Sequence, residues 1–284
     1  MKGLNRGYLP SGWLMTSVHV TVWDETEGEG ATAIFVHNIF TWGDDEAYGF
    51  AAQRPLARSC RLLLVDRRGY GRSPDIERSD FETDAADLVE VLQGTGKSLD
   101  NRGAHLVGHG NGGLAAILAA AQRPDLVRSL ALIQPAAFSV AADRPVVAAM
   151  LARVKDSPRI PESVTAEQYL RASTEGLGMA MPEPTPQRLR AVATSMRERP
   201  VWEAHTPVEA LRASGVPTLV ICGTWEGAPD LYRKYAGDPL IAAAEALAES
   251  IDAQLVRVPG YYPHTQQPDQ VNRALREFWR GLHV

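Results

Sequence analysis

The sequence predicts an α/β protein with a mostly parallel β-sheet that helices cover on both faces. Segments typical of strands alternate with segments typical of helices along most of the 284 residues. This alternation stops between about Ala136 and Ser214, where only helical patterns occur, with prolines between them. We expect such a helical insertion to form a cap over the carboxyl edge of the sheet.

The expected strands are short and apolar. Residues 17–23 alternate apolar and polar side chains as a half-exposed strand does, and residues 31–38 are apolar enough for a buried strand. Further strands are expected at residues 60–66, 104–108, 128–135, 216–223 and 253–260.

Helices are expected between these strands. Residues 80–96 have helical periodicity behind a capping Asp80, and residues 111–123 are small enough for a helix to pack closely on the sheet. The insertion adds the helical patterns "RPVVAAMLARVKD", "TAEQYLRAS" and "TPQRLRAVATSMRERP". After it come the helical segments "PLIAAAEALAESI" and "PDQVNRALREFWRGL".

The composition, 45% hydrophobic and 22% charged, is that of an ordinary globular protein. A net charge of −5 gives no basic footprint for nucleic acid or an anionic membrane. No apolar run approaches the ~18 residues of a membrane span, and residues 1–15 lack the apolar core of a signal peptide. We therefore expect a cytoplasmic protein, with Cys60 and Cys222 as reduced core residues.

The stretch from His105 to Ala116, "HLVGHGNGGLAA", is a glycine-rich turn with two interpretations. Gly108, Gly110 and Gly113 match the phosphate-binding pattern G-x-G-x-x-G. That pattern belongs after the first strand of its unit, with an acidic residue at the end of the next strand. Here several strands come earlier, and the next strand ends at Gln134. The context instead favours the nucleophile elbow G-x-S-x-G, with Gly110 in place of the serine.

Other motifs, in the same order, resemble those of the α/β-hydrolase superfamily over nearly the whole chain. "FVHNIFTWG" resembles its H-G motif, with Asn38 replacing the glycine, and "LLVDRRGYGRSP" is similar to its D-x-R-G-x-G-x-S segment. "PTLVICGTWE" and "RVPGYYPHTQQPDQVNRALREFW" are similar to its acid-bearing strand and its histidine loop. The resemblance implies an α/β-hydrolase fold with an eight-stranded sheet and no cofactor. It also implies a core of residues 1–136 and 215–284, and a helical cap of residues 137–214 after the sixth strand.

The resemblance also predicts a degenerate catalytic triad. Gly110 falls on the nucleophile position and Tyr261 on the histidine position, while Glu226 stands where the acid usually does. Some relatives place the acid one strand earlier, and that position is Gln134, which cannot ionise. Glycine offers no oxygen, and a tyrosine with a pKa of ~10 is a poor base at neutral pH. Acyl-enzyme chemistry at this turn is therefore excluded.

The oxyanion hole, in contrast, is expected to persist. Glycine adopts the strained backbone conformation of the elbow at almost no cost. The N–H of Asn111, at the start of a helix, and an N–H near Ile39 are expected to converge on the position of the oxyanion. We expect a substrate atom or a water molecule in the space that the missing hydroxymethyl group leaves at Gly110.

Four residues are candidates for moving a proton, each with a simpler alternative. Tyr261 could instead pack as a wall, and His264 could be a second histidine without a catalytic role. His37 could only shape its loop, and Glu226 could be a surface carboxylate. His109 is expected to be structural, because it points into the scaffold.

The sequence also provides candidate substrate-binding residues. Aromatic walls of a substrate pocket are expected from Trp42, Trp225 and Tyr262, and its polar floor from Asn38, Ile39, Gly110 and Asn111. Ser73 is expected to be a turn residue. The seven histidines are scattered and form no metal-ligand pattern.

These residues favour a non-hydrolytic enzyme that acts on a small, largely apolar carbonyl compound. It would be a lyase, dehydratase, isomerase or cyclase, in which an oxyanion hole and displaced acid–base groups replace the serine. By analogy such an enzyme, a monomer or homodimer, suits specialised-metabolite biosynthesis. Two alternatives stay open: a catalytically silent ligand-binding or sensor protein, and a hydrolase in which a histidine activates water directly.

Overall fold

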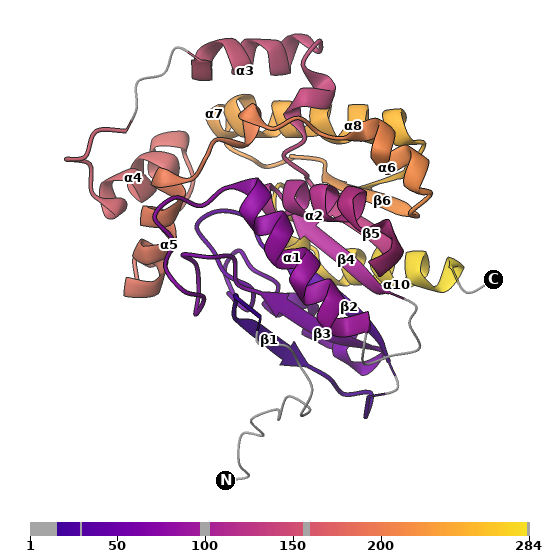
Figure 1. Cartoon of the computed structure of the whole chain (residues 1–284). Coiled ribbons are helices and arrows are strands. Elements are labelled where there is room, and N and C mark those ends of the chain that lie inside the picture. Colours follow the sequence, from indigo (N-terminus) through magenta and orange to yellow (C-terminus); the bar gives the residue numbers. More distant parts are fainter. Residues whose placement is uncertain (1–15, 29, 97–102, 156–159, 283–284) are drawn as a thin grey trace.

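The computed structural model describes residues 16–28, 30–96, 103–155 and 160–282 (Figure 1). The segment of residues 1–15, for which the sequence predicted no signal peptide, lies outside the described residues. Within the described ranges, no helix is both long and apolar enough to cross a membrane.

A single sheet of seven strands forms the centre of the described structure. The strands are β1 (Val20–Trp23), β2 (Ala31–Val36), β3 (Cys60–Val65), β4 (Ala104–His109), β5 (Val127–Ile133), β6 (Thr218–Gly223) and β7 (Gln254–Val258). Their spatial order is β1-β3-β2-β4-β5-β6-β7, and only β1 runs antiparallel to its neighbour. The predicted fold class is confirmed, and each strand named from the sequence is present. The described residues contain seven strands instead of the expected eight, so the helical insertion follows the fifth of them.

Helices cover both faces of the sheet. The α-helices are α1 (Phe81–Gly96), α2 (Asn111–Gln122), α3 (Pro145–Lys155), α4 (Ala166–Ser173), α5 (Pro186–Arg197), α6 (Val208–Ser214), α7 (Asp230–Tyr232), α8 (Asp238–Ile251), α9 (Pro263–Gln266) and α10 (Pro268–Gly281). Short 3₁₀ turns are η1 (Ala51–Arg58), η2 (Pro124–Leu126), η3 (Phe138–Ala141), η4 (Glu175–Leu177) and η5 (Val201–Glu203), and η6 (Arg233–Gly237) is a π-helical turn.

The core has two layers because successive strand side chains point to opposite faces of the sheet. On one face, Ile34 and Val36 pack with α1 and α2; on the other, Ala33 and Phe35 pack with η1 and α10. Figure 1 shows α1 and α2 in front of the strands and α10 behind them. Cys60 and Cys222 are buried and free, as predicted.

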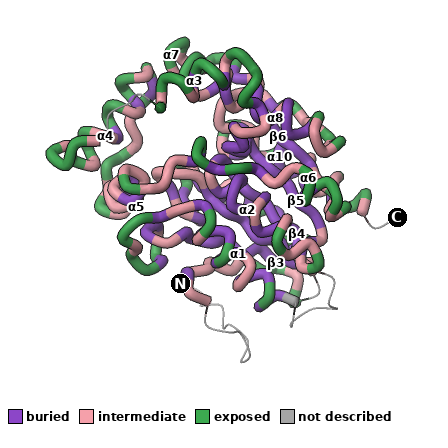
Figure 2. Tube along the Cα trace, turned by 45° about the horizontal axis from the view of Figure 1, so that its top comes forward, coloured by how far each residue is buried: buried purple, intermediate pink, exposed green. Residues whose placement is uncertain are grey.

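The described residues of the insertion between β5 and β6 form helices joined by loops, with no strand among them. Within it, α4 packs on α5, while α3 packs on α8 and α6 packs on α2 and α8. Figure 2 shows exposed residues along α3 and α4, whereas the strands between the two edge strands β1 and β7 are mostly buried. Helix α5 contacts the loops that follow β2 and β3: Thr194 donates to the carbonyl of Gly69, and Arg188 donates to the carbonyl of Phe40. The insertion thus reaches the carboxyl ends of two parallel strands.

Candidate functional site

The turn at Gly110 has the strand–turn–helix geometry of a nucleophile elbow. Gly110 lies between β4 and α2 with φ 55° and ψ −118°, a conformation that side-chain-bearing residues rarely adopt. Its N–H donates to the carbonyl of Ile133, and its own carbonyl accepts from Gly113 and Ala136. Gly112 packs so closely on the end of β2 that an added Cβ would lie 2.4 Å from the His37 carbonyl oxygen. This packing brings the loop after β2 against the elbow.

The side chain of Asn38 fills the space beside Gly110. A Cβ added at Gly110 would lie 2.3 Å from Asn38 Cγ, 2.4 Å from Oδ1 and 2.5 Å from Nδ2. Asn38 Oδ1 also accepts a hydrogen bond of 3.0 Å from the Asn111 N–H, the donor expected to form the oxyanion hole. We expected a substrate atom or a water there. The structure corrects this expectation, because the carboxamide of the protein itself occupies the position.

His37 holds the backbone of this loop in place. Its Nδ1–H donates to the carbonyl of Asn38 at 2.6 Å, and its Nε2 accepts from the Arg67 N–H at 3.0 Å. Burial, with a contribution from the charge of Arg67, lowers the pKa of His37 well below its usual value. With both ring nitrogens bonded to the main chain, the imidazole is neutral and has the contacts of a loop-shaping residue.

The loop after β7 places Tyr261 beside the end of β6. Gln266 Oε1 accepts from the N–H groups of Tyr261 and Tyr262. Gln134, at the alternative acid position, donates through Nε2 to the Tyr261 carbonyl and accepts through Oε1 from the Gly223 N–H. The uncharged amide of Gln134 therefore connects the ends of three segments, a role that a carboxylate could not fill because it has no donor.

Aromatic rings gather in the loops that follow β6 and β7. Trp225 lies 5.2 Å from Tyr232 and 6.2 Å from Tyr261, measured between ring centroids. Tyr262 lies 5.5 Å from Tyr261, and its hydroxyl is 2.6 Å from that of Tyr232. Glu226, next in sequence to the buried Trp225, is exposed and has no hydrogen bond or ion pair with any described residue. The structure thus gathers three of the predicted residues, and Glu226 lies at the surface.

His264 and His109 lie together beneath this aromatic cluster. Both rings are buried, and their centroids are 4.3 Å apart. The Nε2–H of His264 donates to the carbonyl of Tyr48 at 3.1 Å. Burial lowers the pKa of His264 to about 4, and burial with the neighbouring histidines lowers that of His109 well below its usual value. Both imidazoles are therefore neutral near pH 7.

The other predicted residues lie around the elbow and the third strand. Ile39 and Trp42 are half-buried, and the Arg188 guanidinium lies 4.7 Å from the Trp42 ring. The N–H of Phe40, the residue after Ile39, donates to Ser195 Oγ at 3.4 Å. Ser73 is buried and hydrogen-bonds main-chain groups of His19 and Asp66, as expected of a turn residue.

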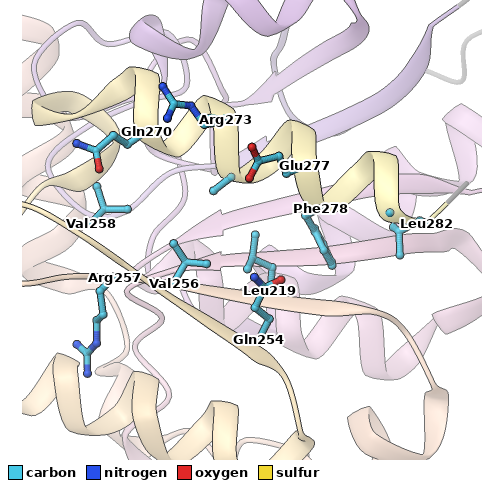
Figure 3. Close-up of a pocket in the computed structure, with 12 residues that line it drawn as sticks. Leu219, Gln254, Val256, Arg257, Val258, Gln270, Arg273, Glu277, Phe278 and Leu282 are labelled. Carbon is cyan, nitrogen blue, oxygen red and sulfur yellow. The ribbon is translucent and has the colours of Figure 1, made fainter.

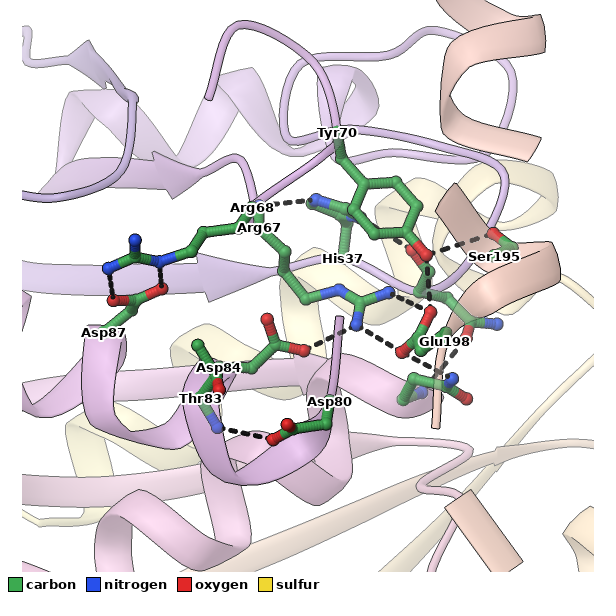
Figure 4. A network of polar contacts seen from close by, with 12 residues as sticks. His37, Arg67, Arg68, Tyr70, Asp80, Thr83, Asp84, Asp87, Ser195 and Glu198 are labelled. Carbon is green, nitrogen blue, oxygen red and sulfur yellow. Dashed lines mark hydrogen bonds and ion pairs between the residues drawn. The ribbon is translucent and has the colours of Figure 1, made fainter. Parts of the chain in front are cut away.

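A buried polar network that the sequence analysis missed lies next to the elbow (Figure 4). Arg67 Nη1 donates to Asp84 Oδ2 and to Glu198 Oε1, each at 2.6 Å, and the three side chains are 5% exposed or less. Tyr70 donates its hydroxyl hydrogen to Glu198 Oε2. Asn111 Nδ2 donates to Glu198 Oε1 at 3.2 Å, so the network reaches the first residue of α2. Glu198 comes from the insertion, where it caps the end of α5.

This network carries one guanidinium and two carboxyl groups. Burial raises the pKa of Asp84 to about 7, since it outweighs the opposing charge of Arg67. Burial opposes the charge on Arg67, but Glu198 and Asp84 outweigh that effect and raise its pKa well above the usual value. Burial and the charge of Glu198 likewise raise the pKa of Tyr70. Arg67 is therefore permanently charged.

The hollow shown in Figure 3 is separate from this site. Its volume is about 570 Å³, and it lies between β7 and α10, lined by side chains such as Val256, Arg273 and Phe278. None of its lining residues belongs to the elbow or to the predicted site. Within the described ranges, no group of three or more His, Cys, Asp or Glu side chains could hold a metal ion.

The fold and the elbow together define an α/β-hydrolase-type protein, and sequence comparison agrees. A model of the alpha/beta hydrolase family matches residues 33–274, so the chain belongs to this family. It is 24% identical to esterase YbfF of Escherichia coli over 89% of this chain and 95% of that protein. It is 30% identical to the sn-1-specific diacylglycerol lipase ABHD11 of Mus musculus over 53% of this chain. The match covers 47% of the length of that lipase. It covers less than half of the length of each curated relative that is 30% identical to this chain.

Solved structures show the same fold at low sequence identity. A thermophilic esterase from Thermogutta terrifontis aligns with a TM-score of 0.59 and 24% identity, covering 94% of both chains. An enol-lactonase from Burkholderia xenovorans LB400 aligns with a TM-score of 0.58 and 19% identity, covering 93% of this chain and 96% of that one. At these identities the likeness supports the fold alone.

The prediction of a non-hydrolytic lyase, dehydratase, isomerase or cyclase was wrong. Four of the curated relatives are named as a lipase, an esterase, an esterase/lipase and a hydrolase, which contradicts the predicted lyase, dehydratase, isomerase or cyclase. The prediction rested on the missing serine, and that observation excludes an acyl-enzyme at residue 110 without excluding hydrolysis by another route.

Proposed function

We propose that this protein is a hydrolase of a small, largely apolar ester or related acyl compound, in which water attacks the acyl carbon directly. The observation that carries the proposal is the elbow of Gly110, which keeps its backbone geometry but offers no nucleophilic side chain. The names of the relatives support hydrolysis, and the absence of a hydroxyl at residue 110 leaves water as the nucleophile. We also propose that residues 137–214 act as the cap and that the triad is degenerate at Gly110 and Tyr261.

The group that we propose as the water activator is Glu198. Its carboxylate lies against the side chain of Asn111, the residue that follows Gly110. Two of its four hydrogen bonds are long, 3.2 Å from Asn111 Nδ2 and 3.3 Å from Arg67 Nη2. A water molecule that replaces the side-chain –NH₂ of Asn111 would donate a hydrogen bond to Glu198 Oε1 at the elbow. General-base catalysis requires such a hydrogen bond to the nucleophile.

The proposed reaction is balanced without a cofactor. The oxygen of water bonds to the acyl carbon, one of its protons passes to Glu198, and the carbonyl electron pair moves onto oxygen. When the tetrahedral intermediate collapses, the bond to the leaving oxygen breaks and Glu198 returns the proton to that oxygen. The products are the free acid and the alcohol.

The aromatic cluster and the buried histidines have supporting roles in this proposal. Tyr261, Tyr262 and Trp225 supply apolar surface for the acyl or alcohol portion of the substrate. His37 and His264 act as positioning residues, because each ring makes a hydrogen bond to main chain in the loop that follows β2. In this mechanism the protein needs no imidazole base.

The test is hydrolysis of p-nitrophenyl butyrate in H₂¹⁸O. We expect steady turnover without a burst of p-nitrophenol, one ¹⁸O atom in the butyrate, and no inhibition by phenylmethylsulfonyl fluoride. Glu198→Gln should lower kcat by about 10²–10⁴-fold, whereas Glu183→Gln, an exposed glutamate of the same insertion, should leave it unchanged.

Two results would contradict the proposal. A burst, or covalent labelling by the sulfonyl fluoride, would show that a nucleophilic side chain acts after all. Full activity of a folded Glu198→Gln variant would remove Glu198 from the mechanism. If that variant unfolds, Glu198→Asp retains the negative charge, and a fall in its kcat with an unchanged melting temperature would support the role.

A further inference from the structure

The carboxamide of Asn38 has one polar atom bound and one without a partner. The Asn111 N–H is a donor, so the atom of Asn38 that faces it must be the oxygen. Nδ2 is then the opposite atom of the same planar group, and no hydrogen bond joins it to a described residue. Asn38 itself is half-buried. The elbow therefore presents an –NH₂ group beside Gly110, in addition to a backbone N–H that is already occupied.

Two hydrogen bonds and the absence of a side chain at Gly110 fix the orientation of this group. His37 Nδ1–H binds the Asn38 carbonyl and holds the backbone, and the Asn111 N–H binds Oδ1 and holds the side chain. The hydrogen atom at Gly110 leaves the room that the carboxamide occupies, since any Cβ there would overlap it. A donor that is held in place before substrate binds needs no reorganisation during the reaction.

We propose that Asn38 Nδ2 is the hydrogen-bond donor to the carbonyl oxygen of the substrate, in place of the Asn111 N–H. The inference rests on the proposed hydrolase function and adds a catalytic residue to it. The Asn111 N–H polarises the carboxamide through Oδ1, which strengthens Nδ2–H as a donor. As water attacks, negative charge develops on the carbonyl oxygen, and the Nδ2–H hydrogen bond strengthens with it.

The first test compares two substitutions at this position. Asn38→Asp keeps the acceptor for Asn111 but removes the –NH₂ donor, and we expect kcat to fall by about 10²–10³-fold. Asn38→Gly restores the residue typical of the family and frees the Asn111 N–H, yet we expect it to lower kcat as well. Gln122→Glu, an exposed amide-to-acid change at the end of α2, is the matched control and should have no effect.

A second measurement does not depend on turnover. In ¹⁵N–¹H spectra, the side-chain –NH₂ resonance of Asn38 is assigned by its loss in Asn38→Asp. Butyl methylphosphonate, a tetrahedral monoanion, imitates the intermediate, and its binding should move that resonance downfield and leave the Asn111 amide resonance nearly unchanged.

The outcomes separate this inference from the proposed function. If the wild type hydrolyses esters but Asn38→Gly is faster, Asn38 obstructs the hole and the inference fails while the function stands. A phosphonate that binds by shifting the Asn111 amide, or that does not bind at all, would also overturn it. If no ester is hydrolysed but the –NH₂ resonance shifts, the function fails and the assignment of Nδ2 as the ligand donor stands.

Discussion

The space beside the elbow can hold the Asn38 carboxamide only because residue 110 has no side chain. The serine of an ordinary elbow would place its Cβ 2.3 Å from Asn38 Cγ, and the φ of 55° adds backbone strain for any residue but glycine. We therefore expect Gly110→Ser to lower the free energy of unfolding by roughly 2–4 kcal/mol, from strain and overpacking together. Combining it with Asn38→Gly should recover about 1–2 kcal/mol of this loss. Urea unfolding of the two single variants and the double variant measures the coupling.

The control for this cycle is Gly94→Ser in α1. An added Cβ there would have no atom within 4 Å, so the change should cost little. If the effects of Gly110→Ser and Asn38→Gly were simply additive, the two side chains would not compete for one space. That result would remove the structural basis for assigning Asn38 to the elbow.

Helix α5 is attached to the core through a buried ion pair. Arg188 donates through Nη1 and Nη2 to the two oxygens of Asp45, each at 2.7 Å, and both side chains are 5% exposed. Its guanidinium also lies over the rings of Trp42 and Tyr48. Removing one member of such a pair leaves a buried charge without its partner. We expect Arg188→Met to lower the free energy of unfolding by about 3–5 kcal/mol.

Hydrogen exchange can locate the effect of this change. Backbone amides of α5 and of the loop after β2 should exchange faster in Arg188→Met, and Arg188→Lys should restore only part of the protection because lysine cannot bind both carboxylate oxygens at once. Arg197→Met, an exposed arginine of the same helix, should leave the exchange unchanged. Unaltered protection of α5 in Arg188→Met would show that other contacts hold the helix.

At the scale of the whole molecule, the fold could be predicted from the sequence, whereas much of the site could not. Strand periodicity, small residues in α2 and the order of the motifs are local signals, and they are sufficient for the sheet and its helices. The substitutions at Asn38 and Gly110 were also visible. The sequence did not show that the Asn38 side chain fills the space at Gly110. That fit depends on the close packing of α2 on the end of β2, which brings together residues about 70 positions apart.

Glu198 could be predicted from the sequence even less than the fit of Asn38 against Gly110. In the sequence it is one charged residue in "MRERP", with nothing to distinguish it from the charged residues on either side. Its position beside Asn111 arises only when α5 packs over the loops after β2 and β3, and then Arg67 and Tyr70 bind it. Glu226, at the expected motif spacing, instead lies at the surface. A motif position determines where the backbone runs, and the packing around it decides which side chains face the site.

The same network should give the whole protein a characteristic pH dependence of stability. Burial raises the pKa of Asp84 to about 7, so the folded state binds a proton that the unfolded chain, with an Asp pKa of ~3.9, releases. The stabilisation from this proton is fully present below about pH 4 and is lost as the pH rises through about 7. Asp84→Asn cannot ionise and should therefore gain stability relative to the wild type between pH 5 and 8, by on the order of 2 kcal/mol.

The measurement is the difference in free energy of unfolding between the variant and the wild type, determined by urea titration at each pH. The difference is needed because His264 also makes stability depend on pH, with the opposite sign. Its pKa is lowered in the folded state, so the folded state loses stability as the pH falls below about 6.5. That contribution is common to both proteins and cancels. Asp143→Asn, at an exposed carboxylate, should show a flat difference. A flat difference for Asp84→Asn as well would show that the Asp84 carboxyl is ionised throughout this range, so that Asp84 and Glu198 share the single positive charge of Arg67.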